Sequence, residues 1–94
     1  MLTIRNKDIY RANVKIGWIR ENDIYDHAGK KLGYFMESNG DIFNYGGTKV
    51  AYLEGDYLVM LNGKKLRLDE NHAKITGGLY SELARAAIRL FLGD

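Results

Sequence analysis

The sequence predicts a mainly β protein in which four tandem β-hairpin repeats share one core with a C-terminal α-helix at about residues 79–92. Three observations lead to this prediction. The tetrapeptide GKKL occurs at 29–32 and again at 63–66, and aligning its copies brings out four similar units. Short runs rich in Ile, Tyr, Phe and Val alternate with Asn- and Gly-containing breaks, which is typical of successive hairpins. From residue 79 onward the apolar period changes from two to about 3.6 residues, which indicates a helix.

The composition is typical of one domain, residues 1–94, of an ordinary soluble globular protein. Of the 94 residues, 46% are apolar and 28% are charged. The chain has no cysteine, which excludes disulfides, thiolate metal sites and cysteine nucleophiles. Its net charge of +2 does not by itself favour nucleic acid or an anionic membrane as a partner.

The four units each open with aspartate, and they span residues 8–22, 23–40, 41–55 and 56–78. Apolar or aromatic residues follow the aspartate, then a polar or glycine-rich break. The chain returns through the strings KIGWI, KLGYF, KVAYL and KLRLD. The units start 15, 18 and 15 residues apart, which suits two strands of about five residues and two turns. We therefore expect one hairpin per unit.

Strict alternation along the returning strings predicts which side chains face the core. The predicted inner pairs are Ile16/Trp18, Leu32/Tyr34, Val50/Tyr52 and Leu66/Leu68. The opposite face carries a column of small residues, Gly17, Gly33 and Ala51. Such a column predicts the close approach of another backbone or ring, or a bulge.

The C-terminal segment predicts an amphipathic helix that docks on the sheet. Its apolar stripe comprises Leu79, Leu83, Ala86, Ala87 and Leu90, and its narrow polar strip comprises Glu82, Arg85 and Arg89. Gly93 stands where a C-cap glycine belongs. Gly77-Gly78 precede the helix N-terminus, where we prefer a flexible entry over an anion site. Because an isolated hairpin is marginally stable in water, we expect the helix to complete a shared core.

Four units that open on DIY, DIF or a related string, followed by one helix, resemble the four-fold β flower proteins, an uncharacterised bacterial family. The resemblance is carried by Asp8, Asp23, Asp41 and Asp56 and by the returning Lys-aliphatic-small-aromatic strings, so it covers nearly the whole chain. It implies hairpin petals arranged with a helix, and it implies no activity. The string YDHAGKKLGY also resembles the YD repeat of bacterial surface and toxin shells, whose units are longer or more strictly periodic.

Few residues indicate catalytic or metal chemistry. Asp26 and His27 would be the acid–base pair of a small enzyme, although a solvated turn histidine is far commoner. Neither His27 nor His72 has the spacing of zinc ligands. The four unit aspartates would bind a cation only if the hairpins converge, and an aspartate after a turn more often bonds its own turn backbone. We therefore assign no catalytic residue, no cofactor and no metal.

Two sets of residues are candidates for a binding surface. Lysines near the turns would contact nucleic acid, namely Lys15, Lys30, Lys31, Lys49, Lys64 and Lys65. Charged residues at sheet edges are ordinary protection against edge pairing, and acids are interleaved here, so nucleic acid is not favoured. If a surface of this protein binds a ligand, the rings Trp18, Tyr34 and Tyr52 are its candidates, although a place in the core is the commoner role for such rings.

The sequence therefore predicts a non-enzymatic binding or assembly domain. Strand edges and spare aromatic residues suggest a homo-oligomer or a protein partner. The longest apolar run is too short and too charged for a transmembrane segment, and no signal peptide is recognisable, which slightly favours the cytoplasm. The alternatives are a small enzyme that uses Asp26 and His27 and a weak nucleic-acid binder that uses the turn lysines.

Overall fold

The chain forms one long sheet and three helical segments over residues 2–78 and 80–93, the part that this computed structural model describes. The strands are β1 (Leu2–Arg5), β2 (Asp8–Arg11), β3 (Val14–Arg20), β4 (Asp23–Asp26), β5 (Lys31–Met36), β6 (Asp41–Asn44), β7 (Lys49–Glu54), β8 (Tyr57–Met60), β9 (Lys65–Arg67) and β10 (Ile75–Thr76). The helical segments are the 3₁₀ helix η1 (Leu68–Glu70), the short helix α1 (Asn71–Lys74) and the C-terminal helix α2 (Glu82–Leu92).

The strands lie in the sheet order β10-β1-β2-β3-β4-β5-β6-β7-β8-β9. From β1 to β9 each strand pairs antiparallel with the next, and β10 pairs with β1 in parallel. This topology confirms the predicted mainly β fold with a C-terminal helix. Strands β1 and β10 were not predicted, and residues 68–74, which were placed in the fourth hairpin unit, are helical instead.

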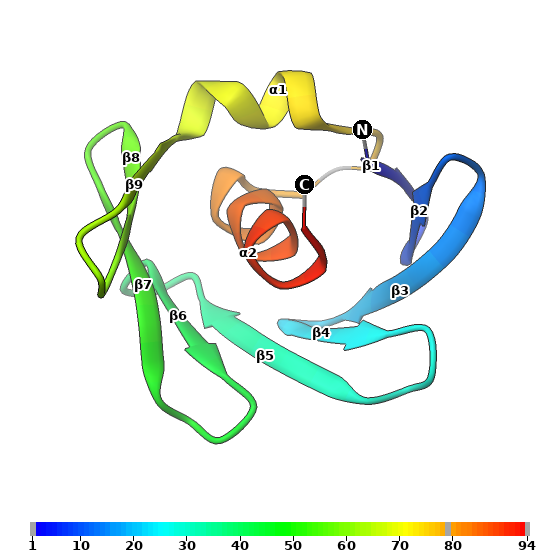
Figure 1. Cartoon of the computed structure of the whole chain (residues 1–94), viewed down its shortest axis with the longest axis horizontal. Helices are drawn as coiled ribbons and strands as arrows, with labels where there is room; N and C mark the ends of the chain where they lie inside the picture. Colours follow the sequence, from blue (N-terminus) through cyan, green and yellow to red (C-terminus); the bar gives the residue numbers. More distant parts are fainter. Residues whose placement is uncertain (1, 79, 94) are drawn as a thin grey trace.

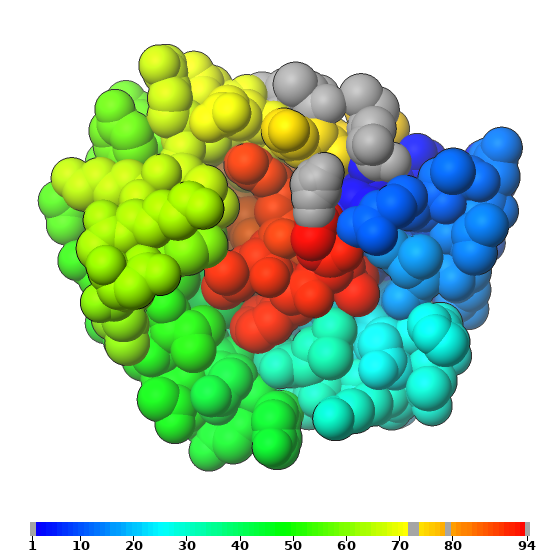
Figure 2. Space-filling model, in the orientation of Figure 1, coloured from blue at the N-terminus to red at the C-terminus, as the bar shows by residue number. Residues whose placement is uncertain are grey.

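The sheet curls around helix α2. Figure 1 looks down the molecule with α2 at the centre, the strands around it, and η1 and α1 crossing from β9 to the edge where β1 lies. In Figure 2 the C-terminal part of α2 is visible in the middle of this face, surrounded by the strands and, at the top, by the yellow segment of η1 and α1. The helix therefore fills the inside of the curl and packs on the apolar face of the sheet, where it was expected to dock.

The inner face of the sheet carries an aliphatic core against α2. Ten sheet residues are no more than 3% exposed, namely Leu2, Ile4, Ile9, Ile19, Ile24, Phe35, Ile42, Ala51, Leu58 and Ile75. They meet the buried helix residues Leu83, Ala84, Ala86, Ala87 and Ile88. Trp18, Tyr34 and Tyr52 alternate with buried neighbours and lie on the outer face, half-buried. Their predicted place in the core was therefore wrong.

A β-bulge explains this error. The register shifts once in each of the β2–β3, β4–β5 and β6–β7 pairs. In the first pair Ile9 faces Gly17 and Tyr10 faces Lys15, so that Ile16 is one extra residue. A bulge interrupts the alternation of side chains between the two faces. The bulged residues Ile16, Leu32 and Val50 pack against the core as predicted, and so do Leu66 and Leu68.

The small-residue column allows the sheet to approach the helix. A Cβ atom added to Gly33 would lie 2.2 Å from Cζ of Phe91 and 2.4 Å from the backbone oxygen of Phe43. A Cβ on Gly17 would lie 2.3 Å from the backbone oxygen of Tyr25. Both predicted features of this column, the close approach of a ring or backbone and a bulge, are confirmed.

Helix α2 begins later than predicted. Ser81 has extended backbone angles, and its hydroxyl oxygen accepts a hydrogen bond from the amide of Ala84 at 3.1 Å, which makes it the N-cap. The predicted first residue, Leu79, lies outside the described residues. At the other end Gly93 has a φ of 81°, as expected of a C-cap glycine.

The polar strip of α2 faces the segment that follows β9. Arg89 donates a hydrogen bond of 2.7 Å to Oδ1 of Asn71, whose side-chain amide donates to the backbone oxygen of Glu82 at 3.2 Å. Asn71 is fully buried, so these bonds satisfy a polar group that burial would otherwise destabilise. Arg85 donates to the backbone oxygen of Gly77 at 2.9 Å. The two arginines thereby attach the closing segment to the helix.

We predict that Gly33→Ala destabilises the protein by about 1–3 kcal/mol, because the new methyl group meets backbone that cannot move aside. Gly46→Ala is the matched control, since the nearest atom to its Cβ is 3.4 Å away and its φ is not positive. We expect this control to stay within about 0.5 kcal/mol of the wild type. Urea unfolding followed by circular dichroism measures both. Equal stability of the two variants would contradict the tight packing of Gly33 against β6 and the Phe91 ring of α2.

Truncation of Leu83 tests the packing of α2. Leu83 is 4% exposed, and Leu83→Ala is expected to lower the free energy of unfolding by about 2–5 kcal/mol. The control Leu61→Ala changes the same residue type at a position that is 61% exposed, and it should leave stability nearly unchanged. A Leu83→Ala variant as stable as the control would show that α2 is not part of the core.

Candidate functional site

The outer face of the sheet repeats one arrangement three times. A lysine Nζ lies beside an aspartate carboxylate and over an aromatic ring. The ion-pair distances are 3.0 Å for Lys15–Asp8, 3.2 Å for Lys31–Asp23 and 3.2 Å for Lys49–Asp41. The same nitrogens lie 5.1 Å, 4.8 Å and 5.0 Å from the ring centroids of Trp18, Tyr34 and Tyr52. We call each such group an outer triad.

The outer triads exist because bulge and register bring their members together. Asp8 faces Trp18 across the β2–β3 pair, and the bulge places Lys15 on the same face. Ring stacking then joins neighbouring pairs, with centroids 5.6 Å apart for Trp18 and Tyr25. A stacked ring offers a ligand little more than its edge, because its neighbours already lie against its faces. Trp18 and Tyr34, whose ring lies 5.0 Å from that of Phe43, are thus accessible mainly along their edges, and Lys49 lies over one side of the Tyr52 ring.

The fourth unit departs from this arrangement. The backbone oxygen of Asp56 accepts the amide of Leu68, as the backbone oxygen of Lys7 accepts the amide of Ile19. Asp56 therefore corresponds to Lys7, one residue before the other unit aspartates, and the prediction that all four share one position was wrong. Tyr57 takes the aspartate position and faces Arg67. The β8–β9 pair also shows no register shift.

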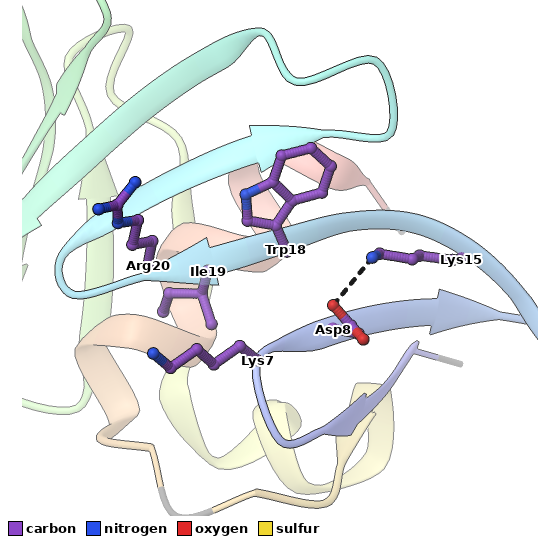
Figure 3. A pocket seen from close by; sticks show the side chains of 6 residues that line it. All are labelled: Lys7, Asp8, Lys15, Trp18, Ile19 and Arg20. Carbon is purple, nitrogen blue, oxygen red and sulfur yellow. Dashed lines mark ion pairs between the residues drawn. The ribbon is translucent and has the colours of Figure 1, made fainter.

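A shallow hollow of about 340 Å³ opens on the outer face at the β2–β3 pair. It is lined by Lys7, Asp8, Lys15, Trp18, Ile19 and Arg20. In Figure 3 the side chains of Lys7 and Arg20 lie on one side of the hollow, and the Asp8–Lys15 ion pair lies on the other. Within residues 2–78 and 80–93, neither Lys7 nor Arg20 takes part in an ion pair. The hollow therefore carries net positive charge.

A second hollow, of about 310 Å³, opens at the N-terminal end of α2. Glu21 and Glu37 both line it, and a carboxylate oxygen of Glu37 accepts a hydrogen bond from Oγ of Ser81 at 2.8 Å. Acidic side chains are favoured at a helix N-terminus. The protein's own carboxylates thus take the place that an external anion would need there.

Asp26 is bonded to its own turn. One carboxylate oxygen accepts hydrogen bonds from the amides of Ala28 and Lys30, both at 2.9 Å. The Lys30 amide is the main cause that lowers the pKa of Asp26, the Ala28 amide lowers it further, and desolvation opposes the shift. Asn44 makes the same two bonds in the next loop, to Gly46 and Thr48, both at 3.0 Å. Because an asparagine cannot act as a base, the shared role is to hold the turn.

The remaining sequence candidates show no catalytic or metal-binding arrangement in the part of the chain that the structure describes. His27 is exposed in the same turn, and the side chain of His72 lies outside the described part. In the described part, no three acidic or histidine side chains come together as metal ligands. Lys15, Lys31 and Lys49 are held in the outer triads, which leaves fewer free cations for phosphate contacts than the sequence suggested. No helix within the described ranges has the length and apolar character that crossing a bilayer requires.

The sheet ends at short edges. Strand β9 carries Lys65 and Arg67, both exposed, and β10 has two residues. Short, charged edges resist pairing with another sheet. The strand edges therefore give less support to self-association than the sequence suggested.

Sequence reasoning missed two sets of residues that the structure brings forward. Lys7 and Arg20 flank the positive hollow, and comparing the units position by position would have found them, because the other units lack cations there. Asn71 gave no such signal, since it stands in the polar string DENHAK and resembles a solvated residue. Comparison of the chain with protein-family models, curated proteins and solved structures finds no match.

We predict that Asp26→Asn keeps the turn and removes part of the acid sensitivity of the protein. The pKa of Asp26 is lowered in the folded state, so its contribution to stability is present above its ordinary value of 3.8 and is lost as the pH falls through the lowered value. Urea unfolding at pH 7 and pH 3 measures the difference. As a control, Asn44→Ala should weaken a turn at both pH values alike. Unchanged acid sensitivity in Asp26→Asn would contradict the assigned bonds.

Proposed function

We propose that this protein is a non-enzymatic binding domain of the four-fold β flower kind, and that it binds its ligand on the outer face of the curled sheet. The observation that carries the proposal is the position of α2 inside the curl. Ala87 and Ile88 are fully buried, so the interior is occupied by the protein's own helix. A ligand then has the outer face, with its rings and charges, as the surface available to it.

The chemistry of the described side chains supports binding over catalysis. The carboxylate of Asp26 is bonded to its turn, and the matching Asn44 has the same role without a titratable group. An acid–base catalyst needs a group free to exchange a proton with a substrate held against it. The outer triads instead present aromatic edges, and aromatic residues are enriched in binding surfaces.

The test is ligand screening by NMR on the isotope-labelled protein. Mixtures of sugars, amino acids, nucleotides and short peptides are added, and amide shifts are mapped on the sequence. We expect the shifted amides to gather in β2–β7 on the outer face, with every ligand recovered unchanged. His27→Ala should give the same map. Consumption of a ligand that depends on His27 would overturn the proposal, and so would shifts confined to α2 and the inner face.

A further inference from the structure

We propose that the hollow at the β2–β3 pair binds a small organic anion, a phosphate or carboxylate group joined to a flat ring. The inference rests on the proposed function and assigns its binding surface to this one hollow. Lys7 and Arg20 hold the anionic group, and the edge of Trp18 contacts the ring. The three outer triads share one structure, so a residue found in one of them alone needs a separate explanation.

Backbone hydrogen bonds establish which residues correspond. The amide of Ile19 donates to the backbone oxygen of Lys7 at 2.8 Å. In the second unit the amide of Phe35 donates to the oxygen of Asn22 at 3.1 Å, and in the third unit the amide of Leu53 donates to the oxygen of Gly40 at 2.9 Å. The position before each unit aspartate is thus Lys7, Asn22 and Gly40.

The second cation of the hollow has counterparts as well. Arg20 follows Trp18 by two residues, and the same step leads from Tyr34 to Met36 and from Tyr52 to Glu54. Together the two positions carry two positive charges in the first unit, none in the second and one negative charge in the third. The Asp–Lys–ring triad is common to all three units, so building the sheet accounts for the triad. The structure of the sheet does not account for Lys7 and Arg20, which occur as a pair of cations in the first unit only.

The nearby carboxylates leave these cations available. Asp8 is paired with Lys15, and Asp23, which faces Arg20 across the β3–β4 pair, is paired with Lys31. Trp18 adds a third donor, because no hydrogen bond joins its Nε1 to another residue in the ranges described. In Figure 3 the indole nitrogen lies on the side of the ring that faces Arg20.

The size and charge of the hollow indicate the class of ligand. Its volume of about 340 Å³ is at the small end of ligand sites, which suits a molecule with a single ring. Lysine and arginine form charge-assisted bonds with phosphate and carboxylate oxygens. The hollow is open to solvent, so we expect modest affinity that falls as salt is added.

Fluorescence of Trp18, the single tryptophan of the chain, reports binding directly. Phenyl phosphate is the probe, with inorganic phosphate as the anion alone and phenol as the ring alone. We expect saturable quenching by phenyl phosphate, weaker binding of inorganic phosphate and no saturation with phenol. Absence of saturable quenching by phenyl phosphate in low-salt buffer overturns the inference.

Two variants locate the site by exchanging residues between units. Lys7→Asn with Arg20→Met gives the first unit the residues of the second, and we expect phenyl phosphate to bind about tenfold more weakly. Lys30→Asn with Lys64→Asn removes the same charge from two loops and should leave binding unchanged. Equal weakening in both double variants would mean that only net charge matters, and it would overturn the proposed site.

A variant designed to gain a second binding site still tests the inference if Lys7→Asn with Arg20→Met folds poorly. Asn22→Lys with Met36→Arg transfers both cations to the second unit, and phenyl phosphate should then shift amides of β4 and β5 as well as those of β2 and β3. Failure to create this second site overturns the inference. Phosphorus NMR of the same samples distinguishes the two proposals, because release of inorganic phosphate would refute a non-enzymatic domain. Binding of other ligands elsewhere on the outer face, with no binding of phenyl phosphate, would refute this site and leave the proposed function standing.

Discussion

The close approach of the sheet to helix α2 is the constraint on which the rest of the structure depends. Nine antiparallel strands in a row have two faces, and one of them must be covered by something from the same chain. Gly17, Gly33 and Ala51 bring the strands so near to α2 that a larger side chain at either glycine would strike the helix or a neighbouring strand. This approach seals the buried aliphatic column between the sheet and α2.

The helix also decides how the curl is closed. Its apolar stripe contacts the strands, and its polar strip is turned toward the gap between the two ends of the sheet. Arg85 and Arg89 bond there to groups of the closing segment, including the buried Asn71. One amphipathic helix therefore satisfies two different surfaces, an apolar sheet and a polar bridge. The interior of the curl is thus filled by the protein's own helix.

Internal repetition separates structural residues from residues that need another explanation. Asp26 and Asn44 hold corresponding turns with the same hydrogen bonds, so the carboxylate of Asp26 needs no catalytic role. The outer triads recur three times and need no ligand to explain them. Lys7 and Arg20 occur at corresponding positions in one unit only. Comparison of the units therefore explains Asp26 as a structural residue and leaves these two cations without a structural explanation.

The sequence by itself determined the succession of antiparallel strands, the C-terminal helix and the close packing at the glycine column, because turn residues and apolar periods are local properties. Tertiary structure decided which face of the strands is buried, because one bulged residue such as Ile16 reverses the alternation that follows it. It also decided the parallel pairing of β1 with β10 and the burial of Asn71, which join residues far apart in the chain. Local patterns carry no record of such distant contacts.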